Sequence, residues 1–194
     1  MIKIITPCSR ENNLILLFNS INFSCDWYIV FDKTHDEAIS IIDRDEFSFL
    51  DKPWIHVKYT KGGVSGNKQR NLALEEISNG WLYFLDDDNL VHPDFFKVAD
   101  EIISNNNKLK CIFFSQVKNE KGEIRGVEPN HVRVNFIDQA QFLIERSLIG
   151  ELRYEQKYEA DGIFIQNIFR NNDPGLFCFH NNPVVTYYNR LNYK

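Results

Sequence analysis

Several features that mark other protein classes are missing from this sequence. The four cysteines are widely separated and form no CxxC pair, so neither a zinc ribbon nor a redox motif is indicated, and reduced, mostly buried thiols are expected. No apolar run approaches the roughly 20 residues that a membrane-spanning helix needs. The opening residues lack the apolar core and small-residue cleavage site of a signal peptide. We therefore expect a cytoplasmic protein, which could still act at a membrane surface on a lipid-linked substrate.

Positive charge is also scarce. The chain has 22 basic against 27 acidic residues and a formal net charge of −5 at pH 7. A broad nucleic-acid surface needs a basic stripe, so we expect no nucleic-acid partner, although a local basic pocket could hold one small anion. With 194 residues, 43% of them hydrophobic, the chain is long enough for one good-sized core. No internal repeat, low-complexity tract or linker divides it, so a single domain is expected.

Strand-like and helix-like segments alternate along the first half and predict an α/β protein. Strands are expected at 2–6, 26–32, 54–60, 81–85 and 111–117, and helices at 11–21, 36–42, 65–80 and 92–107. Ser65 is the expected N-cap and Gly80 the expected stop of the third helix, and Pro93 is placed near the first position of the fourth. The continuous apolarity of 81–85 indicates a strand buried on both faces of a largely parallel sheet, which helices cover on both sides.

The second half is less regular. A strand is expected at 131–136, helices at 138–150 and 159–172, and strands at 175–180 and 183–189.

Three adjacent carboxylates, Asp86, Asp87 and Asp88, follow the apolar run "WLYFL". Capping of the next helix does not explain them, because that helix is expected to begin near Pro93. Neighbouring carboxylates repel one another unless solvent or a cation compensates, and they are the hard ligands that Mg²⁺, Mn²⁺ or Ca²⁺ prefer. Ligands of open α/β sheets bind beyond the carboxyl ends of the strands. A divalent cation carrying a phosphate ligand therefore accounts for both the cluster and its position.

These residues resemble a known motif. "WLYFLDDDN" is similar to the DxD-type motif of GT-A fold glycosyltransferases, in which a divalent metal bridges the diphosphate of a nucleotide sugar. "KGGVSGNKQRNLAL" resembles the segment before that motif in family 2 glycosyltransferases, and equally the matching segment of glucuronyltransferases. "IKIITPCSREN" is similar to their opening strand and loop. The resemblance covers about the first half of the chain.

The resemblance implies a fold, a reaction and a division of labour. The fold would be a GT-A-like, Rossmann-type α/β domain with a mostly parallel central sheet and helices on both faces. Residues 1–90 would bind the nucleotide-sugar donor and residues 91–194 the acceptor. The donor would be a UDP-sugar, the acceptor a saccharide or lipid-linked molecule, and the cofactor Mn²⁺ or Mg²⁺.

The resemblance also implies roles for the carboxylates. Asp88 matches the metal-ligating aspartate, while Asp86 or Asp87 would contact the ribose or sugar or reach the metal through water. Asp32 matches a position that accepts the hydrogen bond of a uracil N3–H, although it could equally be a turn residue before Lys33.

Basic and polar residues would complete the donor site. Asn67, Arg70 and Asn71 share one face of the expected helix, next to a glycine-rich approach suited to an anion. A solvent-facing polar surface is the alternative. Arg70 can make forked contacts to phosphate, and Lys61 and Asn67 are further donor-binding candidates. By analogy, Pro7, Ser9 and Arg10 would hold the base or ribose.

Inverting transfer needs a base that takes the proton of the acceptor hydroxyl. Family 2 enzymes use an acid near the start of a late helix, and "YEADGIFIQNIF" offers Glu159 and Asp161. The family acids are usually adjacent, whereas Ala160 separates these two, so the choice stays open with Asp161 preferred. Helix capping is the alternative role of Asp161. His180 matches a late histidine that binds metal or diphosphate in many GT-A enzymes, and a structural role is the alternative.

Two other functions fit parts of the pattern. A sugar-phosphate nucleotidyltransferase could use the same fold and carboxylates, but such enzymes open with a long glycine-rich basic loop that "TPCSRENN" does not match. A non-catalytic nucleotide- or cation-binding module would keep the aspartates without needing Asp161 or Glu159.

Overall fold

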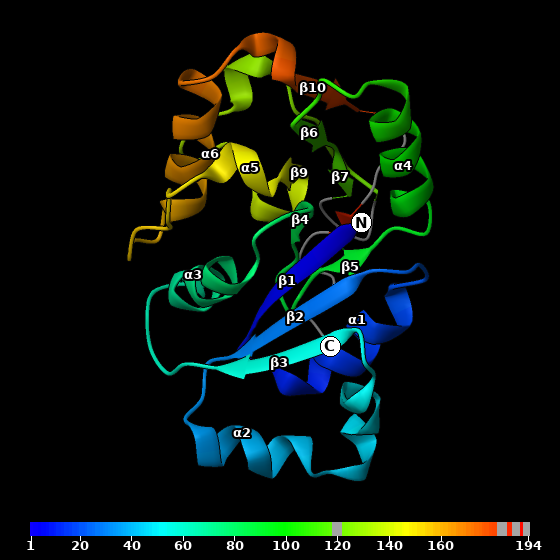
Figure 1. The fold of residues 1–194 in the computed structure, drawn as a ribbon, viewed down its shortest axis with the longest axis vertical. Coiled ribbons are helices and arrows are strands. Elements are labelled where there is room, and N and C mark those ends of the chain that lie inside the picture. Colours follow the sequence, from blue (N-terminus) through cyan, green and yellow to red (C-terminus); the bar gives the residue numbers. More distant parts are fainter. Residues whose placement is uncertain (118–121, 182–185, 188–190, 192–194) are drawn as a thin grey trace.

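A seven-stranded sheet runs through the molecule (Figure 1). The computed structural model describes residues 1–117, 122–181, 186–187 and 191. The strand order is β10-β6-β9-β4-β1-β2-β3. The strands are β1 Ile2–Cys8, β2 Asp26–Phe31, β3 Ile55–Tyr59, β4 Trp81–Phe84, β6 Cys111–Phe114, β9 Phe142–Glu145 and β10 Phe177–His180. All neighbours pair in parallel except β9, which runs antiparallel to both β4 and β6.

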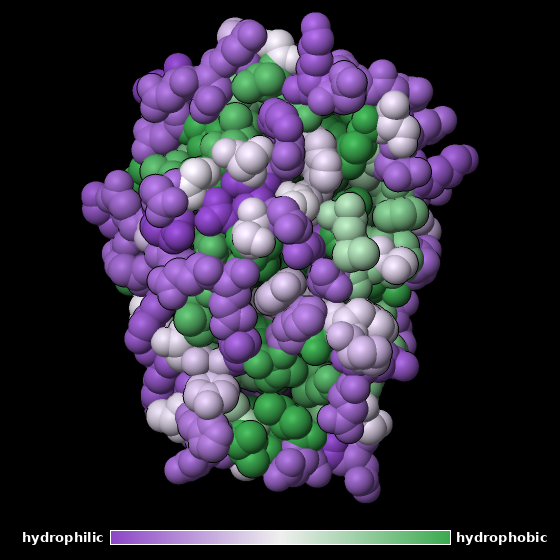
Figure 2. Space-filling model, viewed as in Figure 1, coloured by the Kyte–Doolittle hydropathy of each residue, from purple (hydrophilic) through white to green (hydrophobic). Residues whose placement is uncertain are grey.

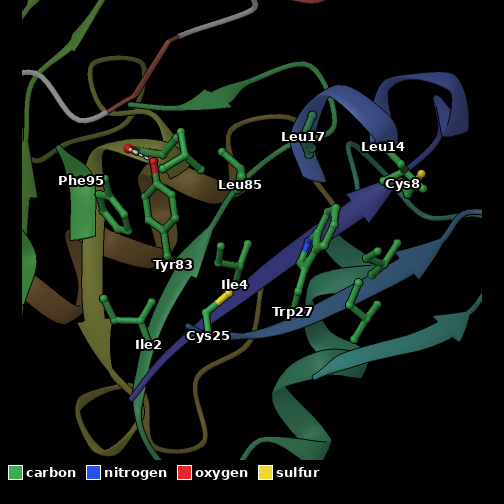
Figure 3. Packing of buried hydrophobic residues seen from close by; sticks show 14 of the residues in the cluster. Ile2, Ile4, Cys8, Leu14, Leu17, Cys25, Trp27, Tyr83, Leu85 and Phe95 are labelled. Atoms are coloured by element: carbon green, nitrogen blue, oxygen red, sulfur yellow. Dashed lines mark hydrogen bonds between the residues drawn. The ribbon is translucent and has the colours of Figure 1, made fainter. Parts of the chain in front are cut away.

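Alternate side chains of the central strands enter two separate hydrophobic layers. Ile4 of β1 packs in one layer and its neighbour Ile5 in the other, because successive side chains of a strand point to opposite faces. Figure 3 shows the first layer, where Ile4, Trp27 and Tyr83 gather on one side of β1, β2 and β4. The indole Nε1 of Trp27 donates to Thr6 Oγ1 at 2.9 Å. Both faces of the sheet are therefore buried.

Helices cover both faces, as expected from the sequence. The first layer is closed by α1 Leu14–Ser20, α2 His35–Ile42, the 3₁₀ segment Asp45–Asp51 and α4 Phe95–Asn105. The second layer is closed by α3 Asn67–Glu76, α5 Arg146–Ile149 and α6 Ala160–Arg170. The face seen in Figure 2 is mainly hydrophilic, with hydrophobic side chains showing between polar ones in both its upper and lower parts. None of the described helices combines the length and apolar character that crossing a bilayer requires.

A small second sheet lies beside the central one. Its order is β5-β11-β7-β8, with bounds Leu90–Val91, Thr186–Tyr187, Gln116–Val117 and Ile124–Arg125. The strand expected at 111–117 is thereby divided at Ser115, so that β6 joins the large sheet and β7 the small one. The hydroxyl of Ser115 donates to the carbonyl of Asn181 at 3.0 Å at this division.

Three helix-end predictions in the first half were wrong. The N-cap of α3 is Gly66, at φ 75°, and not Ser65. The helix ends at Glu76, so Gly80 is not its stop. Pro93 lies outside α4, which begins at Phe95 after Asp94. The expected helix at 11–21 is a 3₁₀ turn, Glu11–Asn13, followed by α1. Several polar residues of a short loop can each cap a helix. The ends of helices are therefore the least certain part of a prediction from sequence.

The larger errors fall in the second half. The expected strand at 131–136 is instead a 3₁₀ turn, Pro129–His131, followed by irregular backbone. The expected helix at 138–150 comprises a 3₁₀ turn, Gln139–Gln141, then β9 and α5. The apolar run of β9 is buried on both faces, and periodicity alone does not separate such a strand from a helix. Helix α6 and strand β10 were predicted correctly, with a 3₁₀ turn, Pro174–Leu176, before β10. Of the strand expected at 183–189, only 186–187 are described.

Candidate active site

The carboxyl ends of β1, β2 and β4 open into a cleft, here named the first cleft. Its volume is about 360 Å³. It is lined by Pro7, Cys8, Ser9, Arg10, Asp32, Gly63, Ser65, Gly66, Gln69, Arg70, Asp86, Asp87 and Asp88. This is the edge at which open parallel sheets bind ligands, and most of the residues predicted to bind the donor lie here.

A second cleft of about 310 Å³ adjoins the first. It is lined by Ser65, Asn67, Arg70, Asp86, Asp88, Arg125, Asn135, Ile137, Asp138, Gln139, Tyr158, Glu159 and Asp161. Both clefts share Ser65, Arg70, Asp86 and Asp88. The N-terminal and C-terminal halves of the chain therefore meet at the aspartate cluster.

Asp87 is occupied by the loop that follows β1. Its Oδ2 accepts hydrogen bonds from the backbone N–H groups of Ser9 and Arg10, both at 2.7 Å, and its Oδ1 accepts from Arg10 Nη1 at 2.6 Å. Asn13 Nδ2 donates to the carbonyl of Asp87 at 2.9 Å. Asp87 is 3% exposed. These contacts show a carboxylate that shapes the first loop, a role that the sequence did not indicate.

Asp88 and Arg10 form an ion pair across the first cleft. Arg10 Nη1 donates to Asp88 Oδ2 at 2.9 Å, so one guanidinium bridges two neighbouring carboxylates. Burial alone would lower the pKa of Arg10, but the Asp87 and Asp88 carboxylates outweigh it and leave the pKa raised. The side chain of Arg10 is 47% exposed, which leaves it accessible to an anionic ligand.

Asp86 pairs with Arg70, the only arginine of α3. Arg70 Nη2 donates to Asp86 Oδ1, and Arg70 Nη1 donates to the carbonyl of Ser65 at 2.7 Å. The guanidinium also lies over the ring of Tyr154, 5.6 Å from its centroid. Burial would lower the pKa of Arg70, but Asp86 and its neighbours outweigh this and leave the pKa raised. Asp86 thus holds a permanent positive charge at the junction of the two clefts.

The asparagines of α3 bind the second half of the chain. Asn67 Nδ2 donates to the carbonyls of Glu155 and Lys157 at 3.0 and 2.8 Å. Asn71 exchanges two hydrogen bonds with the backbone of Tyr154, at 2.9 and 2.8 Å. The polar face predicted for this helix is therefore real, but its two amides face the 154–157 segment.

The remaining donor-binding candidates divide into two groups. Pro7 and Asp32 line the first cleft, and Asp32 Oδ1 accepts the N–H of Gly62 at 2.7 Å, so its predicted contact with uracil stays a prediction. Lys61 is not among the residues that line either cleft. It pairs with Glu37 at 2.9 Å, and the Thr34 backbone and Lys61 hold the pKa of Glu37 at about 2.

The two candidate bases lie at the start of α6 and line the second cleft. Glu159 is exposed and occupies the N-cap position without a side-chain cap bond. Asp161 lies in the first turn, where its Oδ1 accepts the N–H of Gly162 at 2.7 Å. Burial raises the pKa of Asp161 above its ordinary value, although Gly162 and Arg70 oppose the shift. The two acids thus differ in burial and in hydrogen bonding, and which of them acts as a base stays a prediction.

The sequence did not reveal a further acid, Asp138. It lies at the N-cap of the 3₁₀ turn before β9 and lines the second cleft. Burial and the Asp86 carboxylate raise its pKa to about 6, against opposing hydrogen bonds from Ala140 and Gln116. A turn signal at this position could have been found, but the segment was interpreted as a helix.

His180 ends β10, the edge strand of the large sheet. Its ring meets Phe114 edge-on with centroids 6.2 Å apart. It is not among the residues that line either cleft, and its Nε2 is buried without a hydrogen-bond partner among the described residues. Its predicted contact with metal or diphosphate stays a prediction.

The carboxylates at the junction fit a hard divalent cation with few protein ligands. Within the described part of the chain, no group of three or more His, Cys, Asp or Glu residues is placed to hold a metal ion. Asp86 and Asp88 line both clefts. Mg²⁺ in phosphate sites takes one or two protein carboxylates and completes its shell with water and phosphate oxygens. This donor set suits such a cation and would not form a closed protein cage.

No protein-family model matches the sequence, and no curated protein matches it. Solved structures match its fold. TarS 1–349 of S. aureus is similar with a TM-score of 0.71 and 15% identity, over 96% of this chain and 59% of that one. Its complex with UDP-GlcNAc gives 0.70 and 16%.

Glucosyl-3-phosphoglycerate synthase (GpgS) of Mycobacterium tuberculosis is also similar, with a TM-score of 0.66 and 12% identity, over 95% of this chain and 71% of that one. The same protein solved with Mn²⁺, UDP-glucose and phosphoglyceric acid gives 0.64 and 12%. Of the two proteins, TarS 1–349 is the longer relative to this chain, which spans less than two thirds of it. At these identities the likeness concerns the fold, and the chain has the GT-A-type α/β fold that its motifs predicted.

Proposed function

We propose that the chain is a metal-dependent glycosyltransferase that moves a sugar from a UDP-sugar to a hydroxyl of a saccharide or lipid-linked acceptor, with inversion. The observation that carries the proposal is the junction of the two clefts. There Asp86 and Asp88 lie at the end of the central strand β4, between Arg10 on one side and Arg70 on the other. Asp161 lines the adjoining cleft.

The first cleft would bind the nucleotide sugar. Asp88, with Asp86, would hold the divalent cation, which neutralises the leaving diphosphate when bound. Arg10 would contact the diphosphate, since its side chain is accessible and guanidinium groups form charge-assisted hydrogen bonds to phosphate. The likeness in fold to proteins solved with UDP-GlcNAc and with Mn²⁺ and UDP-glucose supports this class of donor.

The second cleft would bind the acceptor. Asp161 would take the proton of the attacking hydroxyl, because its raised pKa gives it a greater proton affinity than an ordinary aspartate. The positive charge of Arg70 would offset the negative charge of the carboxylates at the junction. A base placed across the sugar from the leaving diphosphate suits inversion. A non-catalytic binding module would have no need for such a carboxylate in its cleft.

The proposal is tested with the full chain, Mn²⁺ and a panel of nucleotide sugars, by following both donor binding and slow donor hydrolysis. We expect metal-dependent binding of at least one UDP-sugar, and we expect Asp88→Asn to weaken it by about tenfold or more. Asp173→Asn is the matched control, since Asp173 caps a 3₁₀ turn that lines neither cleft. Absence of metal-dependent binding of every nucleotide sugar would refute the proposal.

A further inference from the structure

Among the polar side chains of the second cleft that the reaction described above does not use, Asp138 and Gln139 are neighbours in the chain. Asp138 and Gln139 come from the turn before β9 and line the cleft on the side of β7 and β8. Neither was singled out by the sequence. Their hydrogen bonds show which of their atoms are still able to bind a ligand.

Asp138 is held rigidly through one of its two oxygens. Oδ1 accepts from Gln116 Nε2 at 2.8 Å and from the N–H of Ala140 at 3.0 Å. The backbone N–H of Asp138 donates to Gln141 Oε1 at 3.1 Å. No described residue donates a hydrogen bond to Oδ2. The carboxyl is thus oriented by the protein while one oxygen keeps its full capacity to accept.

Gln139 offers an unused donor. It is 2% exposed, and its Oε1 accepts the hydroxyl of Tyr154 at 2.9 Å. Its Nε2 has no hydrogen-bond partner among the described residues. A buried amide donor without a partner is costly, and most such groups in native proteins are satisfied. Gln139 lines the second cleft, so a ligand hydroxyl that reaches its buried amide from there would satisfy the donor.

The charges around this pair exclude one class of ligand. Five acidic residues line the cleft: Asp86, Asp88, Asp138, Glu159 and Asp161. Its two basic residues are Arg70, which is paired with Asp86, and Arg125. Arg125 Nη2 donates to the carbonyl of Phe136 at 2.5 Å, and its charge already favours the ionised form of Asp138. A phosphate or carboxylate placed here would meet like charges with little compensation.

We propose that Asp138 and Gln139 form an acceptor subsite for an uncharged polyhydroxyl molecule, a neutral sugar or polyol, and that this subsite rejects acceptors carrying a phosphate or carboxylate. Gln139 Nε2 donates to one hydroxyl and Asp138 Oδ2 accepts from a neighbouring one. Exposed Tyr158 lies at the rim of the same cleft, where its ring can cover a sugar face. The inference rests on the proposed glycosyl transfer. It also separates this chain from GpgS, which was solved with phosphoglyceric acid.

The test uses matched pairs of probes: glucose and glucose 6-phosphate, N-acetylglucosamine and its 6-phosphate, glycerol and glycerol 3-phosphate. Binding to the full chain loaded with UDP and diamagnetic Mg²⁺ is followed by NMR of the side-chain NH₂ of Gln139. We expect at least one neutral probe to shift this resonance, and its phosphorylated partner to bind at least about tenfold more weakly. Equal or tighter binding of the phosphorylated partner overturns the proposal, and so does a resonance that no probe shifts.

Variants separate the two residues. Gln139→Met removes the donor at similar volume and is expected to raise the KM for the preferred neutral acceptor by about three- to tenfold. Asp138→Asn is expected to narrow the preference for neutral over phosphorylated probes by at least about threefold. Gln166→Met and Asp173→Asn are controls outside both clefts. Unchanged acceptor preference in both cleft variants contradicts the subsite.

The same samples distinguish failure of the inference from failure of the proposed function. Donor hydrolysis without acceptor reports the first cleft alone. If hydrolysis is metal-dependent but acceptor preference ignores charge, the subsite is wrong and the transferase proposal stands. If no nucleotide sugar is bound or hydrolysed, the proposed function fails first.

Discussion

Asp86, Asp87 and Asp88 are adjacent, yet their carboxylates meet different parts of the molecule. Asp87 binds the backbone of the loop after β1, Asp86 binds Arg70 of α3, and Asp88 pairs with the accessible Arg10. The sequence predicted that the cluster lies at the ligand-binding edge, because an apolar run ending in acids has the same pattern whatever each acid contacts. It could not predict the division of roles, since the partners lie far away in the chain.

The choice between the two candidate bases gives a first prediction. Asp161→Asn should lower sugar transfer by about 100-fold or more, because an amide cannot take up the acceptor proton. Donor affinity should change much less. Glu159→Gln is the matched variant two residues earlier, on an exposed side chain, and should keep most activity. Transfer rates and donor binding measured on both variants decide the assignment, and a larger loss in Glu159→Gln would reverse it.

Asp138 gives a prediction on stability. Its pKa is about 6 in the folded chain against 3.8 as the ordinary value. Between about pH 4 and pH 6 the folded state therefore binds more protons at this group than the unfolded state, so its contribution to the free energy of unfolding falls as pH rises. Because the side chain is only partly buried, we expect a loss of about 1–3 kcal/mol across this window.

Asp138→Asn should remove that dependence. The quantity to compare is the free energy of unfolding of the variant minus that of the parent chain. This difference should be about 1–3 kcal/mol more positive at pH 7 than at pH 4, because any constant effect of the substitution is the same at both pH values. Urea unfolding of both proteins at several pH values measures the difference. A pH-independent difference would show that Asp138 titrates normally.

The type of a helix or strand was predicted correctly where the local sequence pattern determines it. It was predicted wrongly where packing against distant parts of the chain determines it. Helix α6 and strands β1 and β4 were found because their apolar runs and flanking polar residues agree. The segment 138–150 failed because β9 is a short apolar run, buried between β4 and β6, that continues directly into α5. Its strand conformation depends on backbone hydrogen bonds to two strands that are distant in the sequence. Because the whole segment was predicted as a helix, the turn that carries Asp138 and Gln139 was not predicted either.

The start of α3 is set by a glycine, which gives a prediction for that element. Gly66 has φ +75°, and a Cβ there would lie 2.6 Å from Pro7 Cβ. Gly66→Ala should therefore strain the backbone and push α3 away from the loop after β1, at a cost of about 2–4 kcal/mol in the free energy of unfolding.

Gly62 supplies the matched control. It has φ +83°, but a Cβ added at this residue would meet no heavy atom within 4 Å, so Gly62→Ala incurs the backbone cost alone, about 1 kcal/mol. Denaturant unfolding compares the two variants. Equal losses would mean that the contact with Pro7 relaxes freely.

At the scale of the whole molecule, the two halves are joined through α3. Asn67 and Asn71 reach the 154–157 segment of the second half. Tyr154 in that segment contacts Arg70 on one side and Gln139 on the other. The resemblance in the sequence covered only the first half, because the second half is organised by contacts between residues distant in the chain. The bridge could not be inferred from spacing.

The bridge predicts a variant that impairs both clefts together. Asn71→Ala leaves the buried N–H and carbonyl of Tyr154 without the partners they have at 2.8 and 2.9 Å, so the free energy of unfolding should fall by about 2–4 kcal/mol. Displacement of Tyr154 should then weaken donor binding through Arg70 and acceptor binding through Gln139. Asp161→Asn, in contrast, should leave donor binding nearly unchanged.

Asn172→Ala is the control, because Asn172 donates a hydrogen bond of 2.8 Å to a backbone carbonyl and lines neither cleft. Urea unfolding and donor binding measured on the two variants test the bridge. Normal donor affinity in a folded Asn71→Ala protein would show that the two halves are coupled elsewhere.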